Sequence, residues 1–317
     1  METQEGLRHQ LDSLADLQSI VRTMKALAAS SIHEYEQAVA ALRRYDEALR
    51  LGFAAALRDA PAGAWRVSSH PAEPTRAVAV VFGSDHGLCG RFNEMIADHL
   101  LAGLEQWPAS AGAKRRLLVV GHRLAPLLAE RGVTIDDALG LPGTVDQIAV
   151  TIQLIIQRID DWTPASGGAA LRVFHNRPGP QLSAEPVTRT LLPLDLGAVQ
   201  HLGQREWPGR RLPRAFMHEP ELFSTLVRQH LFMRLFRACA ASQASEQASR
   251  LAAMQRAESS LEDRVASVTA RFRRLRQDAI TAELLEVVSG FEAVAAAQHA
   301  HQGEDSTRRD LGTPRGD

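Results

Sequence analysis

The chain has 317 residues, of which 45% are hydrophobic and only 5% aromatic. This balance is typical of a globular, helix-rich protein rather than of a thick β-sandwich. The formal net charge is -1, so general binding to nucleic acid is not expected, because it requires a basic surface.

The cysteines and the first residues exclude further classes of protein. Cys89 and Cys239 do not have the spacing of a metal site or of a disulfide framework, and we expect neither a metal nor a cofactor. The first ten residues, METQEGLRHQ, contain no apolar leader segment, and no apolar run reaches the roughly 18 residues of a membrane span. We therefore expect any membrane association to go through a partner protein.

The chain is predicted to begin with one long helix. Apolar residues recur at steps of three and four from Leu7 to Leu49, so residues 1–58 are assigned to an N-terminal coiled-coil helix. Either Gly52 or the stretch Asp59-Ala60-Pro61 closes it. Residues 59–74, which contain Pro and Ser, are predicted to form a linker.

Residues 75–200 have a different pattern, in which short β-branched runs alternate with amphipathic segments. The predicted strands are Ala77–Phe82, Leu117–Val120, Leu171–His175 and Val187–Leu194. The predicted helices are Phe92–Trp107, Leu124–Glu130 and Val145–Ile159. This alternation indicates a Rossmann-like α/β domain with a mainly parallel sheet. A loop with four arginines is expected to follow over residues 201–219.

The Gly-rich turn Gly83–Gly90 is the strongest candidate for a nucleotide site, because such a turn can present backbone N–H groups to a phosphate. It matches neither GxGxxG nor GxxxxGK[ST], however, and it lacks a phosphate-binding Lys, so a tight structural turn is the favoured interpretation. Cys89 and His86 could similarly suggest a thiolate nucleophile. A small buried thiol is favoured, because no Asn or Asp is placed to orient the histidine.

A second long helix is predicted for residues 220–298. Between Glu221 and Ser289 there is neither Gly nor Pro, so about 69 residues could run as one helix of roughly 100 Å, with Gly290 as the stop. Its heptad seam consists of Leu251, Met254, Leu261, Val265, Val268, Phe272, Leu275 and Ala279. We expect this helix to pair antiparallel with the first one in a coiled-coil stalk, and residues 299–317 to be a disordered tail.

Four sequence segments resemble one known family. Residues 244–254, ASEQASRLAAM, and 276–290, RQDAITAELLEVVSG, are similar to ASExxAR(M)xAM and RQxxITxELxEIVSG, the C-terminal signature of the γ subunit of F-type ATP synthases. Residues 84–93, SDHGLCGRFN, resemble that family's SDRGLCGGxN, and residues 20–29, IVRTMKALAA, its ITxAMxMVAA. The four matches occur in the family's order along the chain.

The resemblance implies the central-stalk rotor of the F1 motor, a subunit without catalytic activity of its own. Its partners would be three α and three β subunits, the ε subunit and the membrane ring of c subunits, at the cytoplasmic face of a bacterial inner membrane. By residue match, the contacts to the α/β ring would be Met24, Lys25, Arg250, Arg276, Gln277, Thr281 and Glu283. Residues 284–288 would run in an apolar bearing at the top of that ring.

The chain also departs from the family pattern. Residues 28–37, AASSIHEYEQ, stand where the family reads AAxKLRRAQ, and the chain continues well past the SG motif. These departures indicate a divergent γ subunit, and a second, Na⁺-translocating ATPase is an alternative to a H⁺-driven synthase. A nucleotide-dependent α/β enzyme and a homodimeric coiled-coil scaffold are the alternatives from other classes.

Overall fold

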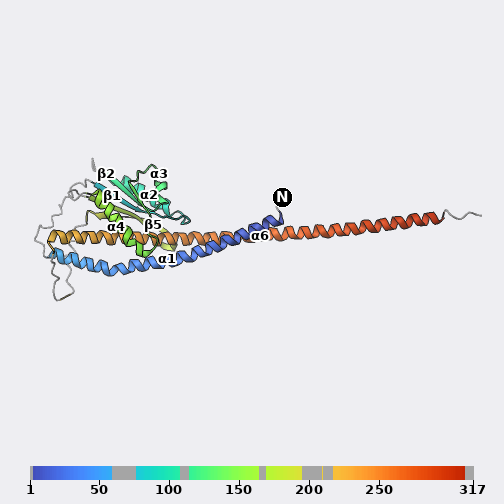
Figure 1. The fold of residues 1–317 in the computed structure, drawn as a ribbon, viewed down its shortest axis with the longest axis horizontal. Helices are drawn as coiled ribbons and strands as arrows, with labels where there is room; N and C mark the ends of the chain where they lie inside the picture. The colour runs from blue at the N-terminus through green and yellow to red at the C-terminus, as the bar shows by residue number, and fades with distance from the viewer. Residues whose placement is uncertain are drawn as a thin grey trace, which may run out of the picture. The chain divides into compact units, whose positions relative to one another are not determined.

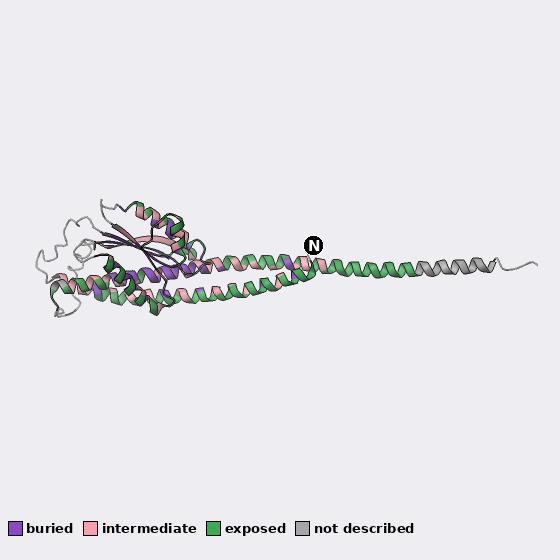
Figure 2. Cartoon of the chain, turned by 45° about the horizontal axis from the view of Figure 1, so that its top comes forward, coloured by how far each residue is buried: buried purple, intermediate pink, exposed green. Residues whose placement is uncertain are grey.

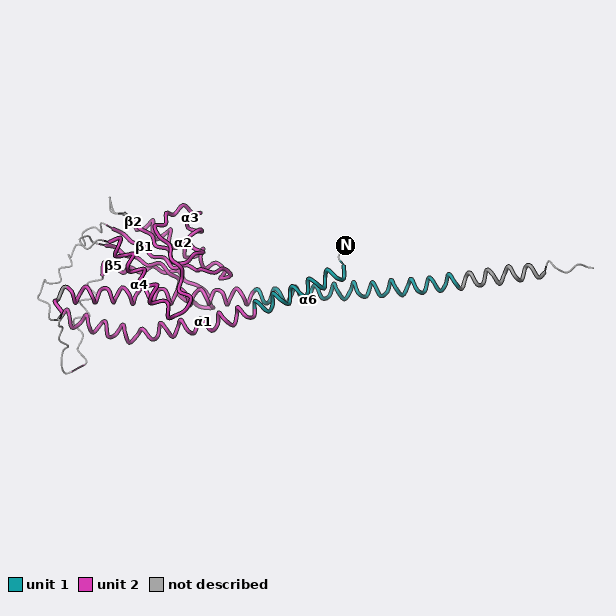
Figure 3. The backbone as a smooth tube through the Cα atoms, in the orientation of Figure 1, with its two compact units in different colours: residues 1–21, 257–317 teal, residues 22–256 magenta. Residues whose placement is uncertain are grey.

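The computed structural model describes residues 3–58, 76–107, 114–163, 169–194, 209 and 217–310 (Figure 1). The predicted linker 59–74 and nearly all of the predicted loop 201–219 lie outside the described residues. The chain divides into two units, which we describe separately (Figure 3). One unit comprises residues 1–21 and 257–317, and the other comprises residues 22–256.

Residues 22–256 contain a sheet of five strands in the order β3-β2-β1-β4-β5. Neighbouring strands are parallel except for the last pair, which is antiparallel, so the predicted mainly parallel sheet is confirmed. The three residues of β3 are too few to give a periodic signal, and this strand was not predicted. The strands are β1 (Arg76–Phe82), β2 (Lys114–Val120), β3 (Asp137–Leu139), β4 (Ala169–Pro178) and β5 (Ala184–Leu192).

Strand β1 is buried on both faces, as a central strand of an α/β sheet must be. Val78, Val80 and Phe82 belong to a core that includes α4 (Val145–Trp162) and the beginning of α6 (Glu219–Asp310). The alternate residues of β1 face a second core, formed with α2 (Phe92–Glu105) and α3 (Leu124–Glu130). The period of two along the strand thus assigns side chains to the two helical layers. Figure 2 shows a run of buried residues on the part of α6 beside the sheet.

Within the same unit, residues 22–58 of α1 (Gln4–Arg58) run antiparallel to the first part of α6. The ring centroids of Phe53 and Phe223 are 6.1 Å apart. Nearer the middle of the pair, the Tyr45 hydroxyl donates a hydrogen bond of 2.6 Å to Oε1 of Gln229. Residue numbers on α1 therefore decrease as the numbers of their partners on α6 increase, which confirms the antiparallel pairing.

The other unit is a shorter pair formed by the first turns of α1 and a later part of α6. Leu7, Leu14 and Val268 are buried there. The predicted seam residues Leu261, Val265, Phe272 and Leu275 pack against them, whereas Ala279 is exposed. The heptad prediction is therefore confirmed as far as Leu275.

The predicted stop at Gly290 is wrong, because α6 continues as a helix to Asp310. A glycine inside a helix costs only about 1 kcal/mol relative to alanine, and the alanine-rich segment that follows favours helix. Residues 299–310, for which disorder was expected, are also helical, whereas residues 311–317 lie outside the described part. Similarly, α1 passes through Gly52 and ends at Arg58, next to the alternative stop.

Candidate partner-binding surfaces

The Gly-rich turn after β1 is closed by its own side chains. The backbone N–H of Ser84 donates to Oδ1 of Asn93 at 3.0 Å, and Nδ2 of Asn93 donates to Oγ of Ser84 at 2.8 Å. Gly83 is required there, because a Cβ atom would come within 2.5 Å of Cβ of Leu124. The prediction of a tight structural turn agrees with this geometry.

The carboxylate of Asp85 occupies the end of the sheet where parallel α/β folds usually bind ligands. Its Oδ1 accepts the backbone N–H of His122 at 2.7 Å, and its Oδ2 accepts the backbone N–H of Leu141 at 2.8 Å. These two donors follow β2 and β3. Because a carboxylate already accepts them, they are not available to a phosphate, which argues against the hypothesis of a nucleotide-dependent enzyme.

Cys89 has the surroundings of a buried structural thiol. Its Sγ lies 3.7 Å from the carbonyl oxygen of His86 and 3.8 Å from Oγ of Ser84, so both of these contacts are made with groups other than the imidazole. Burial raises the pKa of the Cys89 thiol, and the hydrogen bond to Ser84 opposes that shift only in part. A raised pKa disfavours the thiolate, and therefore disfavours a nucleophile.

Arg250, one of the expected ring contacts, lies inside the chain. Its side chain is only 8% exposed and forms an ion pair of 2.6 Å with Glu246, which is 3% exposed. The same guanidinium donates to Oε1 of Gln247 at 2.9 Å and to the carbonyl oxygen of Gly87 at 3.3 Å. Arg250 thus ties α6 to the Gly-rich turn. Glu246 belongs to the same quoted motif, but the sequence did not indicate that the two charges are buried together.

The other expected contact residues are accessible to different degrees. Met24 and Lys25 are half-buried on α1, in the unit of residues 22–256. Arg276, Gln277, Thr281 and Glu283 are exposed on α6, in the other unit. Of these, Thr281 donates from Oγ1 to the backbone oxygen of Gln277 at 2.9 Å.

The part of α6 that follows the α1 pairing carries an unusual number of exposed apolar side chains. Every residue from 276 to 294 is exposed, and the fraction reaches 76% at Phe291. We call the following residues the α6 apolar surface: Ile280, Leu284, Leu285, Val287, Val288, Phe291 and Val294. A contiguous apolar surface of this kind indicates a protein-binding site. In the described part of the chain, no helix is long and apolar enough to cross a membrane.

Comparison with known proteins gives one consistent result. The family model described as ATP synthase matches residues 3–294. Two curated relatives, both called ATP synthase gamma chain, are each 27% identical to this chain, one from Bdellovibrio bacteriovorus and one from Sorangium cellulosum. Each alignment covers 93% of this chain and 99% of the relative.

Two solved structures from the mitochondrial ATP synthase of Euglena gracilis have a similar fold. A chain from the OSCP/F1/c-ring assembly in rotational state 3 has a TM-score of 0.60 at 18% identity, covering 93% of this chain and 96% of that one. A chain from the rotor in rotational state 1 has a TM-score of 0.55 at 16% identity, covering 87% and 98%.

Proposed function

This chain belongs to the ATP synthase family as a γ subunit of the F type, and we propose that it is the rotor that couples ion flow to ATP chemistry. It turns with a membrane ring of c subunits inside a ring of three α and three β subunits. The nucleotide chemistry resides in α and β, and this subunit is non-catalytic. The transported ion, H⁺ or Na⁺, is selected in the c ring, so the proposal holds for either.

The α6 apolar surface carries this proposal. Apolar contacts are not directional, so a helix bearing them can change its orientation within a ring without breaking fixed hydrogen bonds. The polar residues Arg276, Gln277, Thr281 and Glu283 adjoin that surface in sequence and are exposed. Together they give α6 an apolar part that permits rotation and a polar part whose contacts depend on orientation.

Coupling requires that the rotor contact the different conformational states of a β subunit unequally. A ligand that binds two states with equal affinity does not shift the equilibrium between them. Arg276 and Glu283 are opposite charges seven positions apart, about two helical turns, on the same face. Rotation of such a face presents a charged pair to one β subunit and other side chains to the next. Met24 and Lys25 on α1 are proposed to add further contacts to the ring.

Arg250 has a different part in this proposal. Its guanidinium is engaged with Glu246, Gln247 and Gly87, so we assign it to holding α6 on the α/β domain rather than to a direct contact with β. The α/β domain would bind the ε subunit and the c ring at the cytoplasmic face of a bacterial inner membrane. Membrane association then comes only through the complex.

Two alternatives receive less support. A homodimeric scaffold was expected to pair through the predicted heptad seam, but Leu7 and Leu14 of the same chain already cover that seam at Val268. A nucleotide-dependent enzyme would need free backbone N–H groups to bind phosphate, but the N–H groups of His122 and Leu141 already donate to Asp85.

The test is the double variant Arg276→Ala/Glu283→Ala, assembled with the α, β and remaining subunits of the same ATP synthase in vesicles. ATP hydrolysis should persist, and ion pumping per ATP hydrolysed should fall. The matched control is Glu262→Ala/Arg264→Ala, which removes one exposed charge of each sign from α6 where it pairs with α1. Equal pumping per ATP by the Arg276/Glu283 variant and the wild type would contradict the contact assignment.

A further inference from the structure

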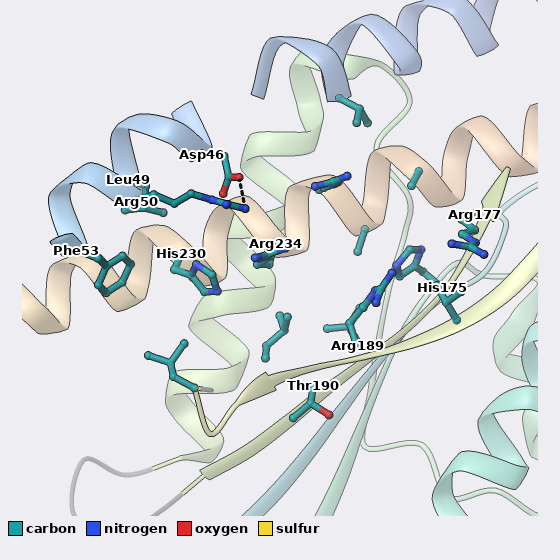
Figure 4. Close-up of a pocket in the computed structure, with 18 residues that line it drawn as sticks. Asp46, Leu49, Arg50, Phe53, His175, Arg177, Arg189, Thr190, His230 and Arg234 are labelled. Atoms are coloured by element: carbon teal, nitrogen blue, oxygen red, sulfur yellow. Dashed lines mark ion pairs between the residues drawn. The ribbon is translucent and has the colours of Figure 1, made fainter. Parts of the chain in front are cut away.

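A cavity of about 700 Å³ lies within residues 22–256, between the helix pair and strands β4 and β5 (Figure 4). This volume is in the range of roughly 300–1,000 Å³ that small-molecule sites occupy. Part of its wall is apolar, formed by Val39, Leu49, Phe53, Val173, Val187 and Leu191. None of the contact residues expected for the α/β ring lines it.

The remaining wall is strongly basic. Five arginines line the cavity, against one carboxylate, that of Asp46. The whole chain has 36 Lys and Arg and 37 Asp and Glu, so its overall composition does not explain this local excess. The arginines come from α1, α6, β4 and β5, and they are Arg50, Arg177, Arg189, Arg234 and Arg237.

Two of these arginines have partners. Arg50 forms an ion pair of 3.0 Å with Asp46, and Arg177 forms one of 2.8 Å with Glu185. Within the described ranges, the other three form no ion pair. In Figure 4, Arg234 on α6 and Arg189 on β5 both lie between His230 and His175. Two different elements therefore contribute guanidinium groups to the lining of one cavity.

The groups around the cavity respond to this positive charge. Burial lowers the pKa of Arg234, and Arg237, Arg50 and Arg189 lower it further against the opposing effect of Asp46. Burial also lowers the pKa of His175 to about 4, with contributions from Arg189, Arg177 and Arg237. Arg189 and Arg237 thus act on both groups, as expected for residues that line the same cavity.

We propose that this cavity is a binding site for a small phosphate-bearing anion, held by Arg189, Arg234 and Arg237. Guanidinium groups suit this ligand, because their planar fork donates two parallel hydrogen bonds to phosphate oxygens. An anion would also relieve the mutual repulsion of the arginines. The apolar part of the wall would accept a non-polar portion of the ligand, so both free phosphates and phospholipid headgroups fit this chemistry.

The site is independent of the rotor proposal, since it concerns a ligand of the isolated chain. The test is calorimetric titration of the purified full-length chain with two probes, inorganic pyrophosphate and a soluble short-chain phosphatidylglycerol. Binding should occur with one site per chain and should weaken as salt is added. Binding of pyrophosphate alone identifies a free phosphate as the ligand, and tighter binding of the lipid identifies a headgroup whose chains contact the apolar wall.

Substitutions locate the site. Each of Arg189→Gln and Arg234→Gln should weaken binding about tenfold or more, the cost of losing a charge-assisted hydrogen bond. The control is Arg228→Gln, an arginine on α6 that pairs with Asp160 at 2.8 Å and does not line this cavity. It removes the same charge and should leave binding unchanged.

A third variant tests the sign of the effect. Asp46→Asn removes the single carboxylate of the lining and releases Arg50, so binding should become tighter by severalfold. A merely structural role of these residues would not produce a gain, and this variant is informative even if an arginine variant fails to fold. Equal weakening by Arg228→Gln and Arg234→Gln, or no binding of either probe, would overturn the proposal.

Discussion

Arg250 and Glu246 lie one helical turn apart on α6 and form an ion pair of 2.6 Å, with side chains 8% and 3% exposed. Burial raises the pKa of the Glu246 carboxyl, and Arg250 opposes that shift. The second carboxylate oxygen of Glu246 has no hydrogen-bond partner among the described residues. Arg250 is therefore the main group that keeps this buried carboxylate charged.

Removing one member of this pair should be costly. Arg250→Met would leave Glu246 without its counter-charge, and breaking a buried pair in this way costs about 3–5 kcal/mol. Urea unfolding of the purified chain measures the loss. Arg228→Met is the control, because its pair with Asp160 is exposed and such pairs contribute about 1 kcal/mol or less. Similar unfolding midpoints for the two variants would show that the Arg250 pair is not structural.

The stability of the chain should fall in mild acid because of His175. Its pKa in the folded chain is lowered to about 4, first by burial and then by Arg189, Arg177 and Arg237, whereas the ordinary value is about 6.5. The unfolded chain therefore binds an extra proton between these values. The stabilising effect is complete above about pH 6.5 and is lost as the pH falls towards 4, on the order of 3 kcal/mol in all.

Urea unfolding at several pH values between 4 and 7 tests this expectation. His175→Gln should reduce the dependence of the unfolding free energy on pH by about half, because burial also lowers the pKa of His230 to about 4. His122→Gln, which replaces an exposed histidine of the same unit, should leave the dependence unchanged. An unchanged slope in the His175 variant would contradict the assignment.

The continuation of α6 through Gly290 can be tested with a single methyl group. A Cβ atom added at Gly290 would meet no atom within 4 Å, so Gly290→Ala should stabilise the surrounding helix by roughly 0.5–1 kcal/mol. Hydrogen exchange of the amides around position 290 should slow. Gly52→Ala in α1 is the comparison, because its Cβ would lie 3.2 Å from Cδ2 of Leu226 and lose part of that gain. Faster exchange in the Gly290 variant would mean that the helix ends there.

The elements that sequence predicts best are those whose periodicity is sustained. The buried run of β1 and the heptad steps through Leu261 and Phe272 gave the correct element type, because each pattern matches only one backbone period. β3 was missed because its three residues are defined by pairing with β2. The stop predicted at Gly290 was wrong because the low helix propensity of one glycine is outweighed by the high helix propensity of the alanine-rich segment after it.

The sites were harder to predict than the elements. The arginines of the cavity span positions 50 to 237, and only the packing of helices against the sheet brings them together. Arg250 was expected to contact the α/β ring, and Glu246 was given no role, because the sequence motif does not show that the two charges are buried together. A signal was present in the neighbouring small residues Ala244 and Ala248, both buried, which show that this part of α6 lies against the domain.

The carboxylate of Asp85 occupies the place in the α/β domain where related sheets bind the phosphate of a nucleotide. A subunit of an ATP synthase works beside nucleotides, and its sheet has the architecture that other proteins use to capture them. With the backbone donors after β2 and β3 bonded to Asp85, the domain carries a built-in substitute for the phosphate. This end of the sheet therefore does not compete with α and β for the nucleotides of the motor.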